Sequence, residues 1–267
     1  MAAIAETTTG AETLAALLRR HDYDRYLMAL FAPTARRPAV QAIYAFNYEI
    51  ARIRETVREP MLGQIRLEWW REGIAAAFAE GPVRRHEVLT PLAEAIRQWG
   101  LSRDPFDRLI DARYHDLSTE PPATLAALES YAEETSAPLQ LLVLETLDAA
   151  GVEANRAARE AAIAYALTGL LRATPFLARS SRHSVPPSLA EEPKAIAERA
   201  KIHLAAARAL RTRISRAALP ALLPAVLAAA DLARLGRAGF DPFADALTRR
   251  DPWRAWRLAI AVIRGRY

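Results

Sequence analysis

The chain has 267 residues, of which 52% are apolar, so it can bury a substantial hydrophobic core. Ala, Leu and Arg are abundant, there are only 10 glycines, and runs of β-branched residues are few, which together predict an all-α fold. The absence of cysteine excludes a disulfide scaffold, thiolate metal sites and a thiol nucleophile.

The formal net charge of +5 conceals an asymmetry between the two parts of the sequence. From Lys194 onward there are 15 Lys and Arg against 5 Asp and Glu, whereas residues 1–193 have 21 against 26. A basic C-terminal third could face anionic lipid or an acidic partner protein, although an ordinary solvated arginine face is the more frequent explanation. Nucleic acid is not expected as a partner, because the basic residues are not interleaved with stacking aromatic residues.

Apolar residues recur at helical spacing through most of the chain. Two short helical segments near residues 14–18 and 26–31 precede a long helix that starts after Arg37-Pro38 and reaches Val57. Further helices are expected around residues 65–78, 88–99, 104–117, 124–148 and 153–180. A polar loop from Ser180 to Pro193 separates them from two long helices and a short one around residues 253–263.

The most apolar stretch runs from Ala217 to Leu235 and contains two prolines, Asp231 and Arg234. Its uncharged part is short for a membrane span, so a buried hairpin is expected there. The first ten residues have neither the basic nor the apolar region of a secretory signal, so we expect a soluble protein. No linker forces a boundary, which predicts one domain over residues 1–267.

The most informative segment runs from Tyr44 to Glu55. On a helix, Tyr44, Tyr48, Ala51 and Glu55 share one ridge. The segment resembles the first aspartate-rich helix of squalene and phytoene synthases, which condense prenyl diphosphates. The resemblance implies a Tyr-Ala-Phe tripeptide followed by carboxylates that, in this family, hold Mg²⁺ against the substrate diphosphate. Aligned on the tripeptide at Tyr44, the acidic positions fall on Ala51, Arg52 and Glu55.

One of these three positions is therefore still a carboxylate. Arg52 and Arg54 place positive charge where the dication would bind, and this charge opposes its binding. Glu55 is expected to be either a surface residue or an ion-paired one, for which Arg52 three positions before it is a candidate partner.

The segment from Leu167 to Arg172 is similar to the family's second motif, whose acids align with Ala173 and Leu177. A ridge of small residues that includes Gly169 favours close helix–helix contact rather than a cavity with ions. Pro175 is expected to kink this helix. Arg172 stands where the family's second motif also has an arginine. Its side chain could hold an anion in a bidentate contact, or it could form an ion pair or cap a helix end.

Other candidates lie outside these two motifs. Asp116 matches a family position near the substrate cleft, at the end of a helix. His86 and His115 lack metal-ligand spacing and are expected to be structural or exposed. The Trp69-Trp70 pair is expected to fill the core rather than line an isoprenoid pocket. Trp253 and Trp256 are expected to anchor a terminal helix, with an interfacial role as the alternative.

The pattern of departures resembles a non-catalytic branch of the family, typified by assembly factor 6 of mitochondrial respiratory complex I. This resemblance, strongest over residues 20–235, implies a bundle of the isoprenoid synthase type without catalytic, metal-binding or cofactor-binding residues. It implies protein partners among complex I subunits or assembly intermediates, an isoprenoid or lipid ligand, and a cytoplasmic location with peripheral contact to the inner membrane. The candidate cleft residues are Tyr44, Asn47, Tyr48, Arg52, Glu55, Asp116 and Arg172.

Two alternatives stay open from the sequence. The first is an active prenyl-diphosphate condensing transferase of isoprenoid biosynthesis, with Mg²⁺ held by rearranged ligands among Glu49, Glu55 and Asp116. The second is a lipid-binding protein that keeps the prenyl cavity without the chemistry.

Overall fold

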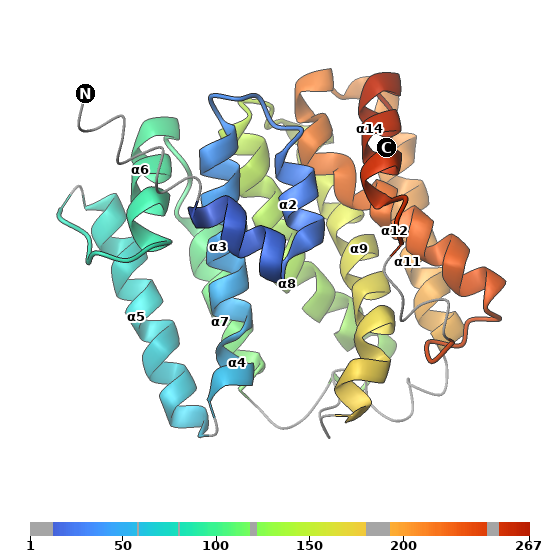
Figure 1. Cartoon of the computed structure of the whole chain (residues 1–267), viewed down its shortest axis with the longest axis horizontal. Helices are drawn as coiled ribbons and strands as arrows, with labels where there is room; N and C mark the ends of the chain where they lie inside the picture. Colours follow the sequence, from blue (N-terminus) through green and yellow to red (C-terminus); the bar gives the residue numbers. More distant parts are fainter. Residues whose placement is uncertain (1–12, 58, 80, 118–121, 180–192, 245–250) are drawn as a thin grey trace. The chain divides into compact units, whose positions relative to one another are not determined.

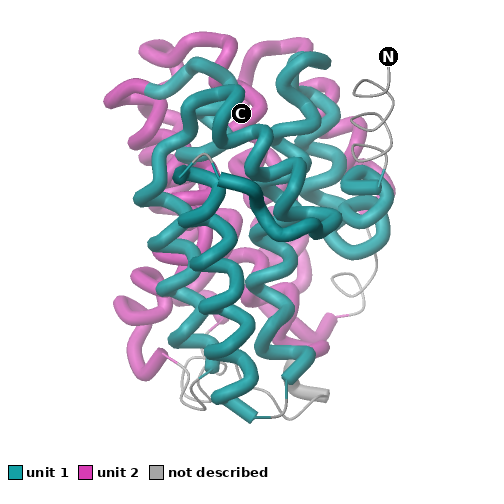
Figure 2. Tube along the Cα trace, turned by 90° about the vertical axis from the view of Figure 1, so that its left-hand side faces the viewer, with its two compact units in different colours: residues 1–118, 141–150 teal, residues 119–140, 151–267 magenta. Residues whose placement is uncertain are grey.

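The computed structural model describes residues 13–57, 59–79, 81–117, 122–179, 193–244 and 251–267, and no strand occurs in these ranges. They divide into two compact units, coloured separately in Figure 2. Unit 1 comprises residues 1–118 and 141–150, and unit 2 comprises residues 119–140 and 151–267. The boundary falls inside one helix, after Gln140. One domain over the whole chain stays a prediction.

Unit 1 contains the helices from the N-terminus to α7, and Figure 1 labels them. After a helical segment at residues 13–21, they are α2 (Tyr23–Ala29), α3 (Arg37–Ala51), α4 (Ile53–Thr56), α5 (Pro60–Phe78), α6 (Leu89–Trp99) and α7 (Asp104–His115). Prolines stand at the first positions of α3, α5 and α7, where a missing N–H is tolerated. Gly100 ends α6 in the left-handed conformation, at φ 61°.

The core of unit 1 is built around α3, whose residues 39–47 are all buried. Phe46 lies at its centre, with its ring centroid 5.4 Å from that of Trp70 on α5 and 5.5 Å from that of Phe106 on α7, both edge to face. Trp70 is buried and Trp69 is half-buried against Trp70 and His86. The prediction that the Trp pair fills the core is therefore confirmed for Trp70, whereas Trp69 lies at the edge of the core.

Unit 2 contains the remaining helices. They are the first part of α8 (Leu125–Thr146), α9 (Val152–Arg179), α11 (Pro193–Ala209), the 3₁₀ turns η1 (Arg211–Arg213) and η2 (Arg216–Ala218), α12 (Leu219–Arg237) and α14 (Arg254–Arg264). In this unit α9 packs against both α11 and α12, and α14 packs on α12. The expected helices from residue 88 to residue 180 match α6 to α9 within two residues at each end. The expected loop from Ser180 to Pro193 lies outside the described residues, apart from Pro193 itself.

The structure corrects two expectations. The long helix predicted to reach Val57 is interrupted at Arg52, where α3 ends and the short α4 begins. The buried hairpin predicted within residues 217–235 is instead one continuous helix, α12. Pro220 occupies its first turn and Pro224 removes only one early hydrogen bond, so neither proline breaks the helix. By length and hydropathy α12 could span a membrane, but 78% of its most apolar window is buried inside the protein.

Candidate functional site

The first candidate cluster lies at the C-terminal end of α3, in unit 1. Tyr44 and Asn47 are buried and Tyr48 is half-buried. The Tyr48 ring stacks on His21 at a centroid distance of 5.2 Å, and the Arg52 guanidinium lies 5.4 Å from the Tyr48 ring centroid. Burial raises the pKa of Tyr48 above its usual value, against the opposing charge of Arg52. The phenol therefore stays protonated at neutral pH.

Arg52 pairs with Glu49, a carboxylate that the sequence indicated only as a candidate Mg²⁺ ligand of the enzymatic alternative. Its Nη1 lies 3.0 Å from Oε1 of Glu49, one turn earlier on α3. Glu55 lies exposed on α4, which is the surface position that was one of its two expected roles, and the observed partner of Arg52 is Glu49 rather than Glu55.

Asp116 and Asn47 meet around an arginine. Nη1 of Arg113 lies 2.9 Å from Oδ2 of Asp116, and Nη2 of Arg113 lies 3.5 Å from Oδ1 of Asn47. All three side chains are buried. A buried carboxylate needs a compensating charge, and here a guanidinium of the chain itself provides it. Sequence reasoning missed Arg113, although a cation three residues before Asp116 on one helix is a detectable signal.

Arg172, the candidate from the second motif, lies in unit 2 and forms an ion pair. Its Nη1 is 2.9 Å from Oδ2 of Asp231 on α12. Arg254 of α14 binds the same carboxylate, with Nη1 2.8 Å from Oδ1 and Nη2 3.2 Å from Oδ2. Asp231 and Arg254 are buried, and Arg172 is half-buried. Of the two roles left open for Arg172, the ion pair is the one observed. A single acid within the apolar stretch of residues 217–235 was the available signal for Asp231.

The small-residue ridge of the second motif is only partly as predicted. Ala162 is buried on α9, but a Cβ placed on Gly169 would meet no heavy atom within 4 Å. The prediction of close helix–helix contact is therefore wrong at Gly169, where the described residues leave open space. Ala173 is half-buried on the same helix.

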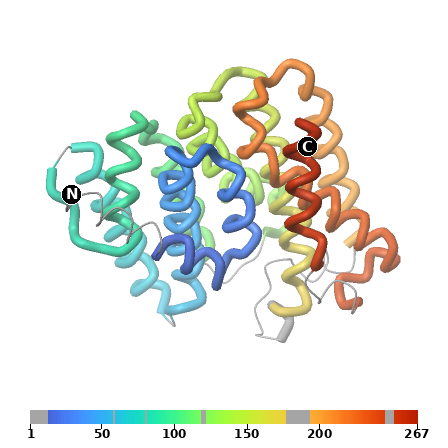
Figure 3. The backbone as a smooth tube through the Cα atoms, turned by 45° about the horizontal axis from the view of Figure 1, so that its top comes forward, coloured from blue at the N-terminus to red at the C-terminus, as the bar shows by residue number. Residues whose placement is uncertain are grey.

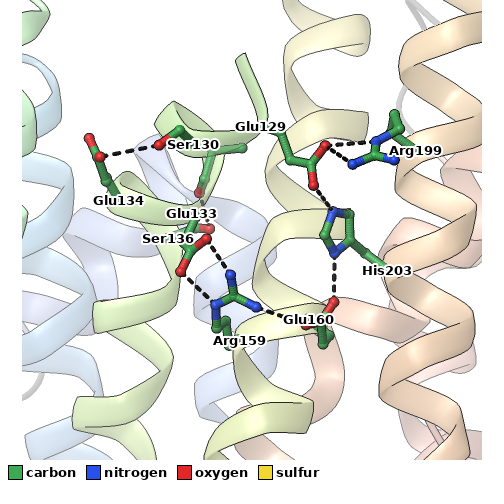
Figure 4. A network of polar contacts seen from close by, with 10 residues as sticks. Glu129, Ser130, Glu133, Glu134, Ser136, Arg159, Glu160, Arg199 and His203 are labelled. Atoms are coloured by element: carbon green, nitrogen blue, oxygen red, sulfur yellow. Dashed lines mark hydrogen bonds and ion pairs between the residues drawn. The ribbon is translucent and has the colours of Figure 1, made fainter. Parts of the chain in front are cut away.

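A second polar cluster of unit 2 was not indicated by any motif, and Figure 4 shows it. His203 of α11 lies between two carboxylates, with Nδ1 2.6 Å from Oε2 of Glu160 and Nε2 2.9 Å from Oε1 of Glu129. Arg199 binds the outer side of Glu129, with its Nε 2.7 Å from Oε2. A neutral imidazole donates only one hydrogen bond and an ionised carboxylate only accepts, so this geometry favours the imidazolium.

The pKa values of the pair agree with that geometry. Burial alone would lower the pKa of His203, but the hydrogen bonds and charges of Glu160 and then Glu129 together outweigh it and raise that pKa. The hydrogen bond from His203 lowers the pKa of Glu160 despite its burial. The cluster thus links α8, α9 and α11 through charged hydrogen bonds.

The described residues do not offer a site that fits Mg²⁺. No group of three or more His, Asp or Glu side chains able to hold a metal occurs among them. Asp116 is bound by Arg113, and two of the three aligned positions near α3 are Ala51 and Arg52. His86 accepts hydrogen bonds at Nδ1 from the N–H groups of Val88 and Leu89 and so caps α6. His115 is exposed. Both histidines have the structural or surface character that was predicted.

Known proteins resemble the chain along most of its length. The family model for squalene/phytoene synthase matches residues 18–193. The complex I assembly factor 6 of Rattus norvegicus is 30% identical over 94% of this chain and 81% of its own length, and that of Homo sapiens is 28% identical over 88% and 76%. Among solved structures, squalene synthase HpnC from Alicyclobacillus acidocaldarius superposes with a TM-score of 0.77 at 21% identity, covering 90% of this chain and 97% of that one. This likeness confirms the predicted all-α fold of the isoprenoid synthase type.

Proposed function

Because the chain belongs to the squalene/phytoene synthase family, we propose that it is a non-catalytic member that assists the assembly of respiratory complex I. The proposal rests on one observation above all, the 30% identity to an assembly factor over 94% of the chain. Its partners would be complex I subunits or assembly intermediates. The similarity to squalene synthase HpnC and to a dehydrosqualene synthase concerns the fold alone, because these sequences are 21% and 16% identical to the chain.

The geometry of unit 1 supports the non-catalytic part of the proposal. A prenyl-diphosphate condensing enzyme needs carboxylates free to bind Mg²⁺, since the metal neutralises the departing diphosphate. Here the buried Asp116 already has a cation, Arg113, at 2.9 Å. Arg52 is likewise paired, with Glu49. An added dication would have to displace Arg113 from a buried ion pair, which is costly.

The first experiment tests the enzymatic alternative. Purified full-length protein is incubated with farnesyl or geranylgeranyl diphosphate and Mg²⁺, with an authentic squalene synthase as the positive control. We expect no release of diphosphate and no head-to-head product above the no-protein background. Turnover that is lost in the Asp116→Asn variant would replace the proposal with the condensing-enzyme alternative.

The second experiment tests the assembly role in a strain from which the gene is deleted. We expect lower NADH dehydrogenase activity in membranes and accumulation of complex I intermediates on native gels, with a normal isoprenoid profile. The Glu55→Gln variant should restore complex I fully, because Glu55 is exposed on α4. A deletion strain with normal complex I and depleted isoprenoids would contradict the proposal.

A further inference from the structure

Helix α14 exposes a continuous apolar stripe. Trp253, Trp256, Ile260 and Ile263 are 61%, 64%, 45% and 75% exposed. Their spacing of three, four and three residues places them on one face of the helix. Exposed apolar residues are ordinary when scattered, but four large ones along three turns form a surface whose hydration is unfavourable. This stripe therefore has the character of a binding surface.

The stripe is held outward by contacts on the opposite face of α14. Arg254 is fixed to Asp231 on α12 by the buried ion pair described above, and Leu258 and Ala261 are buried beside it. At the C-terminal end, Arg216 donates hydrogen bonds to the carbonyl oxygens of Val262 and Ile263, at 3.0 and 3.1 Å. Figure 3 shows α14 (dark red) alongside the other helices of unit 2. Rotating α14 to bury the stripe would break the Arg254 ion pair, so the exposure is fixed by structure.

Positive charge borders the stripe. Residues 253–267 include four arginines, of which Arg254 is buried against Asp231 and Arg257 pairs with the buried Asp251 at 3.3 Å. Arg257 and Arg264 are exposed and lie along one edge of the stripe on a helical wheel, and Arg266 follows on the C-terminal side. Arg211 and Arg216, both exposed, add charge near the same end, since Arg216 caps α14 and the Arg211 charge acts on the phenol of Tyr267.

We propose that this face of α14 is a docking surface for an anionic lipid bilayer, with the helix lying in the plane of the interface. Trp and Ile side chains would enter the boundary between headgroups and acyl chains, where indole rings are most favourable. The arginines would extend their guanidinium groups to lipid phosphates, which complements their charge. A protein groove could also take the apolar stripe, but the exposed charged groups along its border are arginines, and the one acid that pairs with them, Asp251, is itself buried. This arrangement favours a uniformly anionic surface. The inference goes beyond the assembly role and does not depend on it.

The test measures binding of the full chain to vesicles. Vesicles of neutral phosphatidylcholine are compared with vesicles that contain about 30% phosphatidylglycerol, by co-sedimentation over a range of lipid concentrations. We expect binding to the anionic vesicles that weakens as salt is added, with little binding to the neutral ones. The double variant Trp256→Ser, Ile263→Ser should lower the apparent affinity about tenfold or more.

Two matched controls separate the stripe from general effects. Met61→Ser with Ile65→Ser removes two exposed apolar side chains from α5 in unit 1 and should leave binding unchanged. Arg264→Gln with Arg266→Gln should weaken binding to anionic vesicles, whereas Arg103→Gln with Arg108→Gln on α7 should not. All eight substituted side chains are exposed, so we expect every variant to fold. Circular dichroism melting curves check this expectation.

Three results would overturn the proposal. The first is absence of binding to both kinds of vesicle. The second is binding that the α14 variants and the α5 control change equally. The third combines absent vesicle binding with a wild-type dimer in analytical ultracentrifugation that the Trp256→Ser, Ile263→Ser substitutions dissociate. This result would assign the stripe to contact with a second copy of the chain.

Discussion

Arg113 and Asp116 form a buried ion pair one turn apart, with Nη1 of the arginine 2.9 Å from Oδ2 of the aspartate. The pair occupies the helix end that resembles a substrate-cleft position of the family. Asn47 of α3 accepts a longer contact from the same guanidinium, at 3.5 Å. The Asp116 carboxylate thus has its counter-charge within unit 1, although Nε of Arg113 is buried without a hydrogen-bond partner among the described residues. The contribution of the pair to stability can be tested apart from any function.

Replacing Arg113 with Met should strongly destabilise the protein, because it leaves the Asp116 carboxylate buried without a counter-charge. Breaking a buried pair in this way costs about 3–5 kcal/mol. Urea unfolding followed by circular dichroism measures the change in the free energy of unfolding. The control is Arg103→Met, which breaks the more exposed pair with Asp107 and should cost at most about 1 kcal/mol. Equal losses in the two variants would show that the Arg113 pair has no special role.

Replacing Arg254 with Met should loosen α14. Asp231 would lose two contacts but keep the one from Arg172, so the expected loss is about 2–3 kcal/mol, smaller than for Arg113. Hydrogen exchange of the α14 amides should accelerate more than that of α9. The comparison variant on the same helix is Arg257→Met, which breaks a single contact of 3.3 Å from an exposed guanidinium and leaves Asp251 with the hydrogen bond from the N–H of Trp253, so its loss should be smaller than for Arg254→Met. Faster exchange in the Arg257 variant than in the Arg254 variant would contradict this assignment.

The sequence was sufficient for the fold and insufficient for the site. Helical periodicity, proline and glycine placed most helix ends within two residues, because these local signals act over one or two turns. The ion-pair partners were missed for a physical reason. Arg172 and Asp231 are 59 positions apart, and Glu129 and His203 are 74 apart, so only the packed fold brings them together. The interruption at Arg52 was missed because the apolar spacing continues through Ile53. Such spacing carries no information about one local break in the backbone hydrogen bonding of a helix.

Replacing Gly169 with Ala should stabilise the protein. Gly169 lies inside α9, where glycine costs about 0.5–1 kcal/mol relative to alanine, and an added Cβ would meet no heavy atom within 4 Å. A rise of that size in the free energy of unfolding is the expected result. Gly73 in α5 is the contrasting position, because its Cβ would come within 2.7 Å of the buried Leu89 side chain. Gly73→Ala should therefore gain less or lose stability. A loss in Gly169→Ala would mean that another group packs closely on this face of α9.

The His203 cluster should make stability depend on pH in a defined direction. Since the pKa of His203 is raised in the folded protein, its contribution is complete below the unfolded value of about 6.5 and is lost as pH rises through the folded pKa. The pKa of Glu160 is lowered, so its contribution is present above the unfolded value of about 4.5 and is lost as pH falls through the folded pKa. The two effects together stabilise the protein most between about pH 4.5 and pH 6.5.

Unfolding free energies measured in urea from about pH 4 to pH 9 test this expectation, because they report the difference in bound protons between the folded and unfolded states. Wild type should lose stability as pH rises above about 6.5, because the unfolded chain gives up the histidine proton there while folded His203 keeps it for its hydrogen bonds to Glu160 and Glu129. The loss is complete once the pH exceeds the raised folded pKa of His203. In His203→Gln this alkaline decline should disappear, since an amide does not titrate in that range. His115→Gln removes an exposed histidine and should keep the wild-type decline. A decline that persists unchanged in His203→Gln would show that another group titrates. It would also show that the His203 cluster holds α8, α9 and α11 together without the charge of His203.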